Sequence, residues 1–280
     1  MSTVIISAQE VNKLRSMTGA GMMDCKKALQ EANGNFEIAI ELLRKKGQKV
    51  SAARAENQTG EGIVLTHVSD DGKEAKILSF ACETEPVSKV KDFRDLAHSI
   101  LKTAVKHNVT FKEEVLNLLM ENGRTVNENI LDLTGKIGEK IVICDYYSLQ
   151  GEKIVSYVHS NGKIGVLVAL KNVGLVDVSE VGKDVAMQIA AMKPLAVDKD
   201  GIDPKIVERE LEIGKEQARA EGKPEAMLEK IAQGKLNKFF KDNTLLNQDF
   251  VKDPTITIAQ YLNSISSGLT VEKFIRVQIG

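Results

Sequence analysis

A strand-to-helix stretch that occurs twice is the feature that most restricts how this chain can fold. Its first copy begins with the apolar run Ile77–Cys82, typical of a buried strand, and ends with helical spacing through Phe93, Leu96 and Ile100. Between them lies Thr84-Glu85-Pro86-Val87, where Pro suits the first turn of a helix because it has no amide hydrogen to donate. On its own, this corner is either an ordinary helix start or an exposed surface that contacts another molecule.

The second copy follows about 89 residues later. A shift of 89 positions places Ile77-Leu78 on Val166-Leu167 and Val87 on Val176, and a shift of 90 places Gly72 on Gly162. Each copy therefore reads as strand, turn, strand, corner and helix. The duplication predicts an α+β fold with two pseudo-repeated α/β subdomains, each built on a small antiparallel sheet, and not a solenoid array.

The composition narrows the function classes. The chain has 280 residues, enough for about two domains of ordinary size, and 42% hydrophobic with 28% charged residues is typical of a globular protein. The net charge of −1 argues against a nucleic-acid binder that relies on phosphate contacts. Four Tyr, eight Phe and no Trp also leave few rings for base stacking. We therefore expect no nucleic-acid partner.

The cysteines and the apolar runs indicate where the protein works. Cys25, Cys82 and Cys144 are far apart in apolar settings, which predicts reduced thiols. The segment MSTVIISAQE has no long apolar core, and no run approaches a membrane span. We expect a cytoplasmic protein without a membrane partner. The chain ends at Gly280, directly after the expected last strand, so we also expect no further C-terminal module.

The first segment, residues 1–55, reads as a small three-helix domain with a connector. The first helix runs near Val11–Met17, and the second ends at Asn33-Gly34. The third starts after Asn35, a good N-cap, and is expected to stop at Gly47, so that residues 48–54 form a polar connector. A bundle with so small a core is typical of a docking module.

The two core subdomains are expected at residues 56–150 and 151–280. In the first, strands are predicted at 63–67, 75–82 and 140–147, and helices at 93–106, 113–122 and 126–137. In the second, strands are predicted at 154–159, 164–170 and 274–279, and helices at 181–192 and 257–264.

A helical hairpin is predicted within the second subdomain, at about residues 203–241. Val207, Leu211, Gly214 and Ala218 are spaced 4, 3 and 4 residues apart, as in a coiled-coil seam. Gly222-Lys223-Pro224 then turns the chain into a second helix. The hairpin is either a solvated arm or an arm that contacts a partner, and both interpretations stay open.

The sequence lacks recognisable motifs for catalysis, metal binding or phosphate binding. The four histidines have no metal-ligand spacing with one another or with the cysteines, and there is no GxSxG. Lys26-Lys27 and Lys136 lie near glycines, but no phosphate loop is completed. We therefore expect a binding or regulatory protein rather than an enzyme, with no metal, no cofactor and no small-molecule substrate of its own.

Several motifs resemble those of one family. The stretch Leu14–Leu29, LRSMTGAGMMDCKKAL, resembles the N-terminal signature of the elongation factor Ts family. The stretches 157–168 and 184–191, and the motifs GKP at 222–224, KFF at 238–240 and FIR at 274–276, match the same family in order and spacing. The resemblance covers the whole chain. It implies a ubiquitin-associated-like N-terminal domain, a two-part core and an inserted coiled coil.

The resemblance also implies an activity. Members promote guanine-nucleotide exchange on elongation factor Tu during translation elongation. The corner matching Thr84-Glu85-Pro86-Val87 pushes into the partner near its magnesium ion and weakens GDP. The remaining contact positions of the family match Arg15, Met22, Met23, Lys26 and Arg54 in the N-terminal segment, and Ile164, Gly165 and Gln188 in the second subdomain.

Two departures from the family pattern affect these expectations. The family usually has Asp-Phe where this chain has Glu85-Pro86, so the aromatic wedge is missing and Pro buries less apolar surface. Gln188 stands where some members carry His. We expect nucleotide exchange to which the corner contributes less, and the N-terminal domain and the second subdomain contribute more. The alternative is a partner or holdase for the same GTPase that does not drive nucleotide release.

Overall fold

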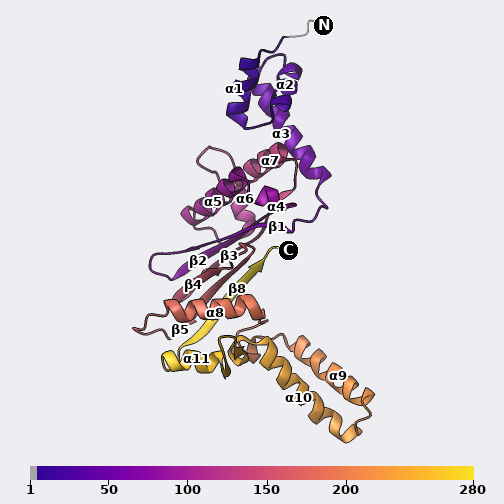
Figure 1. Ribbon diagram of the computed structural model, residues 1–280, viewed down its shortest axis with the longest axis vertical. Coiled ribbons are helices and arrows are strands. Elements are labelled where there is room, and N and C mark those ends of the chain that lie inside the picture. The colour runs from indigo at the N-terminus through magenta and orange to yellow at the C-terminus, as the bar shows by residue number, and fades with distance from the viewer. Residues whose placement is uncertain (1–4) are drawn as a thin grey trace.

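The computed structural model describes residues 5–280, so residues 1–4 of the predicted first segment lie outside it. The molecule is elongated, with a three-helix bundle at one end, two sheets with their helices in the middle, and a helical hairpin at the other end (Figure 1). Helices and small antiparallel sheets are combined, so the predicted α+β class is confirmed.

The bundle consists of α1 (Ala8–Thr18), α2 (Met22–Glu31) and α3 (Phe36–Ala53). Two of its helices, α1 and α3, begin at residues whose side chains cap them. The Ser7 hydroxyl accepts the Glu10 amide hydrogen, and the Asn35 side chain accepts the Ile38 amide hydrogen at 3.1 Å. Leu14, Cys25 and Leu29 are fully buried in the small core between the three helices.

The expected stop at Gly47 and the polar connector after it are wrong, because α3 continues through Gly47 to Ala53. Gly47 crosses α7 (Val126–Ile137), where a Cβ on Gly47 would lie 2.5 Å from the Leu131 carbonyl oxygen. A Cβ on Gly135 would lie 2.8 Å from the Gly47 Cα. Gly47 therefore lets two helices approach closely instead of ending one of them.

The first core carries a sheet in the order β1-β2-β3, all antiparallel. Its strands are β1 (Glu61–Val68), β2 (Glu74–Cys82) and β3 (Ile141–Gln150), and its helices are α4 (Glu85–Ser88), α5 (Lys91–Lys106), α6 (Lys112–Asn117) and α7. The second predicted helix, 113–122, is shorter than expected. Leu118 is extended and the Met120 amide donates to the Arg124 carbonyl, so a turn replaces the last helical residues.

The second core repeats this arrangement with β4 (Lys153–Val158), β5 (Ile164–Lys171) and β8 (Thr270–Gln278), in the order β4-β5-β8. Its helices are α8 (Ser179–Met192) and α11 (Ile258–Ile265). Each sheet is thus a hairpin, as the sequence repeat predicts, with a third strand that returns from later in the chain. The short elements η1 (Lys199–Gly201), η2 (Leu245–Asn247), β6 (Asp249–Phe250) and β7 (Asp253–Thr257) were not predicted.

The two sheets pack face to face. Their shared core includes Ile77 and Leu149 of the first sheet and Leu167 of the second, all buried. Helices α5 and α7 cover the outer face of the first sheet, and α8 and α11 cover that of the second. Because β2 and β5 are buried on both faces, they read as continuous apolar runs instead of alternating ones.

The hairpin consists of α9 (Pro204–Ala220) and α10 (Glu225–Asn243) and projects from the second core (Figure 1). Gly214 and Ala218 of the predicted seam are buried. A Cβ on Gly214 would lie 3.1 Å from the Ala232 Cα, so the helices approach closely at this point. The antiparallel hairpin is therefore present as predicted.

Candidate functional site

The corner after β2 presents three exposed residues, Thr84, Glu85 and Pro86, on a fixed base. Thr84 is the N-cap of α4, and Pro86 lies in the first turn of that short helix. Glu85 and Pro86 are exposed, whereas Val87 is 8% exposed and packs into the first core. The Glu85 carboxylate pairs with Lys89 at 2.7 Å, and this hydrogen bond lowers the pKa of Glu85. An acidic residue and a proline therefore form the tip.

The corner is held by side chains from elsewhere in the chain. Glu139 accepts the Thr84 amide hydrogen at 3.1 Å and the Thr84 hydroxyl hydrogen at 2.6 Å. The Cys82 thiol donates to the Thr84 carbonyl oxygen, and burial raises the pKa of Cys82 to about 12, so it remains a neutral donor. These contacts leave the backbone of the corner little freedom before any partner arrives.

The predicted N-terminal contact residues lie on the exposed surface of the bundle. Arg15 is in the last turn of α1, and Met22, Met23 and Lys26 lie in the first turns of α2. Met22 is 52% exposed and Met23 65% exposed. Met17 at the end of α1 is 58% exposed and was not among the predicted contact residues. Flexible methionines next to two cations make an adaptable, partly apolar surface.

Arg54 lies elsewhere, at the end of α3, and is engaged within the chain. Its guanidinium donates to the Glu83 carboxylate at 2.8 Å, next to the corner. The structure therefore groups Arg54 with Thr84–Val87 and not with the bundle surface.

In the second core, two predicted residues line an apolar groove of about 500 Å³. Ile164 at the start of β5 and Gln188 of α8 line it, together with Tyr157, His159, Met187, Phe250, Val251 and other side chains. Phe250 ends β6 and Val251 follows it, and this segment was not predicted because so short a strand has no periodic pattern.

Gly165 is next to Ile164 but faces the other way. A Cβ on Gly165 would lie 2.4 Å from Val64 Cγ1 and 2.9 Å from Ile77 Cδ1, inside the contact between the sheets. Gly165 is thus a position of close sheet packing, and it supports Ile164 from behind.

Gln188 is 2% exposed and uses its amide within the chain. Its Nε2 donates to the Asp249 carbonyl at 3.1 Å, and its Oε1 accepts the Val251 amide hydrogen at 2.9 Å. These bonds hold the segment that carries Phe250 and the 54%-exposed Val251. Gln188 therefore shapes one wall of the groove.

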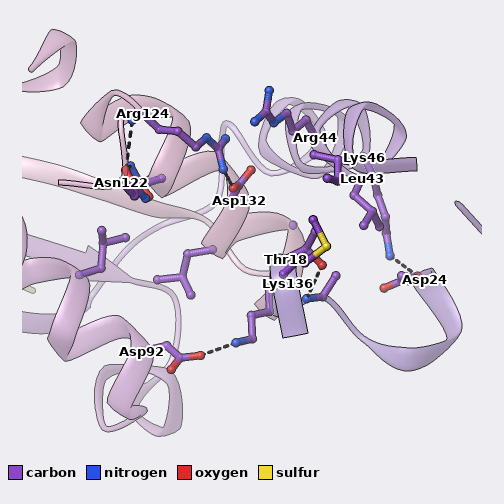
Figure 2. Close-up of a pocket in the computed structure, with 17 residues that line it drawn as sticks. Thr18, Asp24, Leu43, Arg44, Lys46, Asp92, Asn122, Arg124, Asp132 and Lys136 are labelled. Atoms are coloured by element: carbon purple, nitrogen blue, oxygen red, sulfur yellow. Dashed lines mark hydrogen bonds and ion pairs between the residues drawn. The ribbon is translucent and has the colours of Figure 1, made fainter. Parts of the chain in front are cut away.

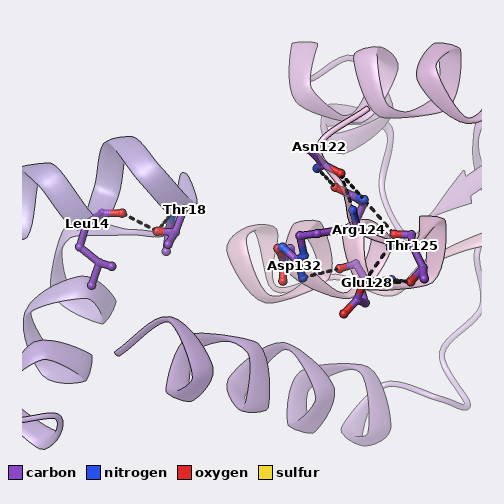
Figure 3. Close-up of polar contacts among 9 residues, drawn as sticks. Leu14, Thr18, Asn122, Arg124, Thr125, Glu128 and Asp132 are labelled. Carbon is purple, nitrogen blue, oxygen red and sulfur yellow. Dashed lines mark hydrogen bonds and ion pairs between the residues drawn. The ribbon is translucent and has the colours of Figure 1, made fainter. Parts of the chain in front are cut away.

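A second hollow, of about 400 Å³, lies between the bundle and the first core (Figure 2). Charged side chains of both signs line it, and most of them pair with one another, as Lys136 does with Asp92 and Lys46 with Asp24. Arg124 turns toward Asp132 and the first turn of α7 (Figure 3). Paired charges indicate a solvated joint between two packed parts and not a ligand site.

Among residues 5–280, no cluster of three or more His, Cys, Asp or Glu side chains is arranged to hold a metal ion. In the same range, no helix is both long and apolar enough to cross a membrane.

Comparison with known proteins agrees with the motifs. The family described as elongation factor Ts matches residues 83–280. The elongation factor Ts of Cytophaga hutchinsonii is 65% identical over 279 residues, with both chains covered completely. The chain belongs to the elongation factor Ts family.

Other family members extend the match over the same length. The elongation factor Ts of Amoebophilus asiaticus is 53% identical over 98% of this chain and 99% of its own, and that of Christiangramia forsetii is 46% identical over the same shares. The resemblance read from the sequence motifs is therefore confirmed, and the chain is a member of a family of translation elongation factors.

Proposed function

We propose that this chain is a guanine-nucleotide exchange factor that binds elongation factor Tu in its GDP form and promotes GDP release. Membership of the elongation factor Ts family supports the partner and the role. The observation that carries the mechanism is the clamped, exposed corner at Glu85-Pro86. In this role the factor works in the cytoplasm by binding alone. It uses no cofactor, nucleic acid, membrane or substrate of its own.

The mechanism follows from how a GTPase holds GDP. A backbone loop and a magnesium ion surround the phosphates, so a protein that disturbs this arrangement weakens GDP. By linkage, GDP weakens the binding of that protein to the same degree. The corner, Thr84–Val87, is proposed to bear on this region. It meets the partner already ordered, so little binding free energy is lost in ordering it.

The other proposed contacts supply the affinity. Arg15, Met22, Met23 and Lys26 hold a helix of the partner's nucleotide domain. Ile164 and the groove beside it contact a second surface of the partner, with Gly165 and Gln188 acting from behind. Along the long axis of the molecule, the bundle, α4, α8 and the hairpin follow one another (Figure 1), so one elongated partner can meet them in succession. The hairpin α9–α10 adds a further contact.

The test is stopped-flow release of a fluorescent GDP from elongation factor Tu over a range of factor concentrations. We expect wild type to accelerate release to a saturating rate. Pro86→Phe restores an aromatic ring and should raise that rate by about threefold to tenfold, equivalent to about 0.7–1.4 kcal/mol. Pro86→Ala is the matched control and should change it little, because most of the binding energy lies elsewhere.

Binding without acceleration by wild type would contradict the proposal. If Pro86→Phe then restored release, the chain would be a non-exchanging partner in which the corner has lost its activity. That outcome is the second candidate function, and the missing aromatic ring at Pro86 is the observation that favours it.

A further inference from the structure

A cluster of polar contacts joins the end of α3 to the start of the corner. At its centre is Glu83, the residue between β2 and Thr84. Its Oε2 accepts from Arg54 Nη1 at 2.8 Å and from Asn57 Nδ2 at 2.8 Å, and its Oε1 accepts the Lys140 amide hydrogen at 2.6 Å. Three donors from two distant segments therefore converge on one carboxylate.

Burial and charge make this carboxylate hard to replace. The Glu83 side chain is 13% exposed, and Arg54 is 40% exposed. Burial alone would raise the pKa of Glu83, but the Lys140 amide, Asn57 and Arg54 together bring it below its usual value. Glu83 is thus ionised at neutral pH. Because each of these partners is a donor, an uncharged amide in its place would turn an NH2 group against at least one of them.

The neighbours of Glu83 extend the connection. Lys140 Nζ donates to the Ala55 carbonyl at 2.5 Å and to the Asn57 carbonyl at 2.9 Å, in the segment that follows α3. Glu139, the residue before Lys140, is the one that holds Thr84. Two consecutive residues therefore hold the corner on one side and the end of α3 on the other.

Helix α3 connects this cluster to the bundle. It is a single helix of 18 residues whose first half packs in the bundle and whose C-cap is Arg54. Near its middle, Gly47 crosses α7 at Gly135. The bundle and the corner are thus attached to one helix, which is fixed where it crosses α7 and again at the Arg54–Glu83 pair.

We propose that Arg54 and Glu83 are a positioning pair that fixes the corner relative to the bundle, so that binding of the bundle to the partner drives the corner into place. This inference rests on the proposed exchange function. It predicts that the pair is needed for the rate of nucleotide release and not for affinity. Without the pair, the bundle and the groove keep their contacts, but the corner is no longer held where it acts.

The experiment compares Glu83→Gln, Arg54→Met and the double variant with wild type in the full chain. Glu83→Gln keeps the side-chain shape and removes the charge. We expect it to lower the saturating rate of GDP release about tenfold, or about 1.4 kcal/mol, while the half-saturating factor concentration stays within about twofold. The double variant should lose no more than the stronger single variant, because the two residues act as one unit.

The control is Glu121→Gln, which removes one partner of the exposed Lys102–Glu121 ion pair on the first core and should leave rate and affinity unchanged. Thermal unfolding checks that each variant is folded. If Glu83→Gln fails to fold, Arg54→Met carries the test from its more exposed position.

Wild-type saturating rates in both folded variants would overturn the inference. So would unchanged saturating rates at higher half-saturating concentrations, because the pair would then serve binding alone. Failure of the proposed function looks different, since wild type itself would not accelerate release.

Discussion

At the scale of single residues, the Tyr261 hydroxyl shows how the second core couples packing to charge. It donates to the Asp184 carboxylate at 2.9 Å, and Asp184 also accepts from Lys252 at 2.6 Å. Burial, aided by the bond to Asp184, raises the pKa of Tyr261 to about 12. The network holds α11 and the β6–β7 segment against α8, and its members Asp184 and Lys252 also line the groove.

A pH dependence follows from this raised pKa. In the unfolded chain Tyr loses its proton at about pH 10, whereas folded Tyr261 keeps it longer, so the unfolded state binds fewer protons and stability falls as pH rises. The stabilisation that Tyr261 contributes to the folded state is complete below about pH 10 and is lost toward pH 12. We expect urea unfolding to show a loss of about 1 kcal/mol from this residue by about pH 11.

Tyr261→Phe should flatten this alkaline loss. Some slope should remain, because burial also raises the pKa of Tyr146. The exposed Tyr147 provides the control, since Tyr147→Phe removes a hydroxyl without a buried partner. Equal alkaline slopes in wild type and Tyr261→Phe would show that this hydroxyl has no part in the effect.

At the scale of elements, the crossing of α3 and α7 decides how the bundle sits on the core. The two helices meet at Gly47 and Gly135, where no side chain separates the backbones. Nothing in the bundle itself requires this arrangement, because its core closes among α1, α2 and α3. The joint is therefore a separate structural feature, and it can be tested separately.

Gly47→Ala should open this joint. The new Cβ would lie 2.5 Å from the Leu131 carbonyl oxygen, which is backbone and can move only with the helix. We expect a loss of about 1–3 kcal/mol and faster amide hydrogen exchange in the second half of α3. Gly234→Ala in α10 is the control, because a Cβ there meets nothing within 4 Å and helix propensity favours Ala. Unchanged stability in Gly47→Ala would mean that the helices simply slide apart.

At the scale of the whole molecule, the hairpin is an addition to a core that closes without it. Its two ends are held together, since the Leu195 amide donates to the Asn243 carbonyl at 2.8 Å and the Leu245 amide donates to Ala196 at 2.9 Å. The chain thus leaves and re-enters the second core at one place. Between these points it buries its seam mainly against itself.

Removal of residues 200–241, with a short Gly-Ser linker in their place, should therefore leave the core folded. We expect a thermal unfolding midpoint within a few degrees of wild type and retained but weaker binding to elongation factor Tu, since one of the several proposed contacts would be lost. Circular dichroism and titration calorimetry measure the two effects. An unfolded core would show that the hairpin is part of the fold, and unchanged affinity would show that it is a solvated arm.

Most elements could be predicted because local interactions decide them. The apolar runs of β2 and β5, the cap at Asn35 and the turn at Gly222-Lys223-Pro224 act within a few residues of where they stand. The seam through Gly214 and Ala218 was readable for the same reason, since helical spacing is a local property. The corner, too, follows from a proline at the end of an apolar run.

Motifs give the positions of the proposed site residues in the chain, but they do not give the surroundings of those residues. Met22 and Met23 are exposed as a contact surface requires, whereas Gly165 and Gln188 are buried. A motif records which residue occupies a position and contains no information about what packs against it. Met17, Phe250 and Val251 were missed because nothing local distinguishes them from other apolar residues.

The amino-acid sequence by itself thus determined the family, the repeated strand–corner–helix units and the position of the hairpin, since each rests on short-range pattern. Only the tertiary structure decided that α3 runs through Gly47, that two sheets stack face to face, and that Glu83 joins α3 to the corner. These features depend on close approaches between residues such as Gly47 and Gly135, or Arg54 and Glu83, that are far apart in the chain. Such contacts exist only once the whole chain is packed, because the free energy that favours them comes from burial and charge pairing in the folded state.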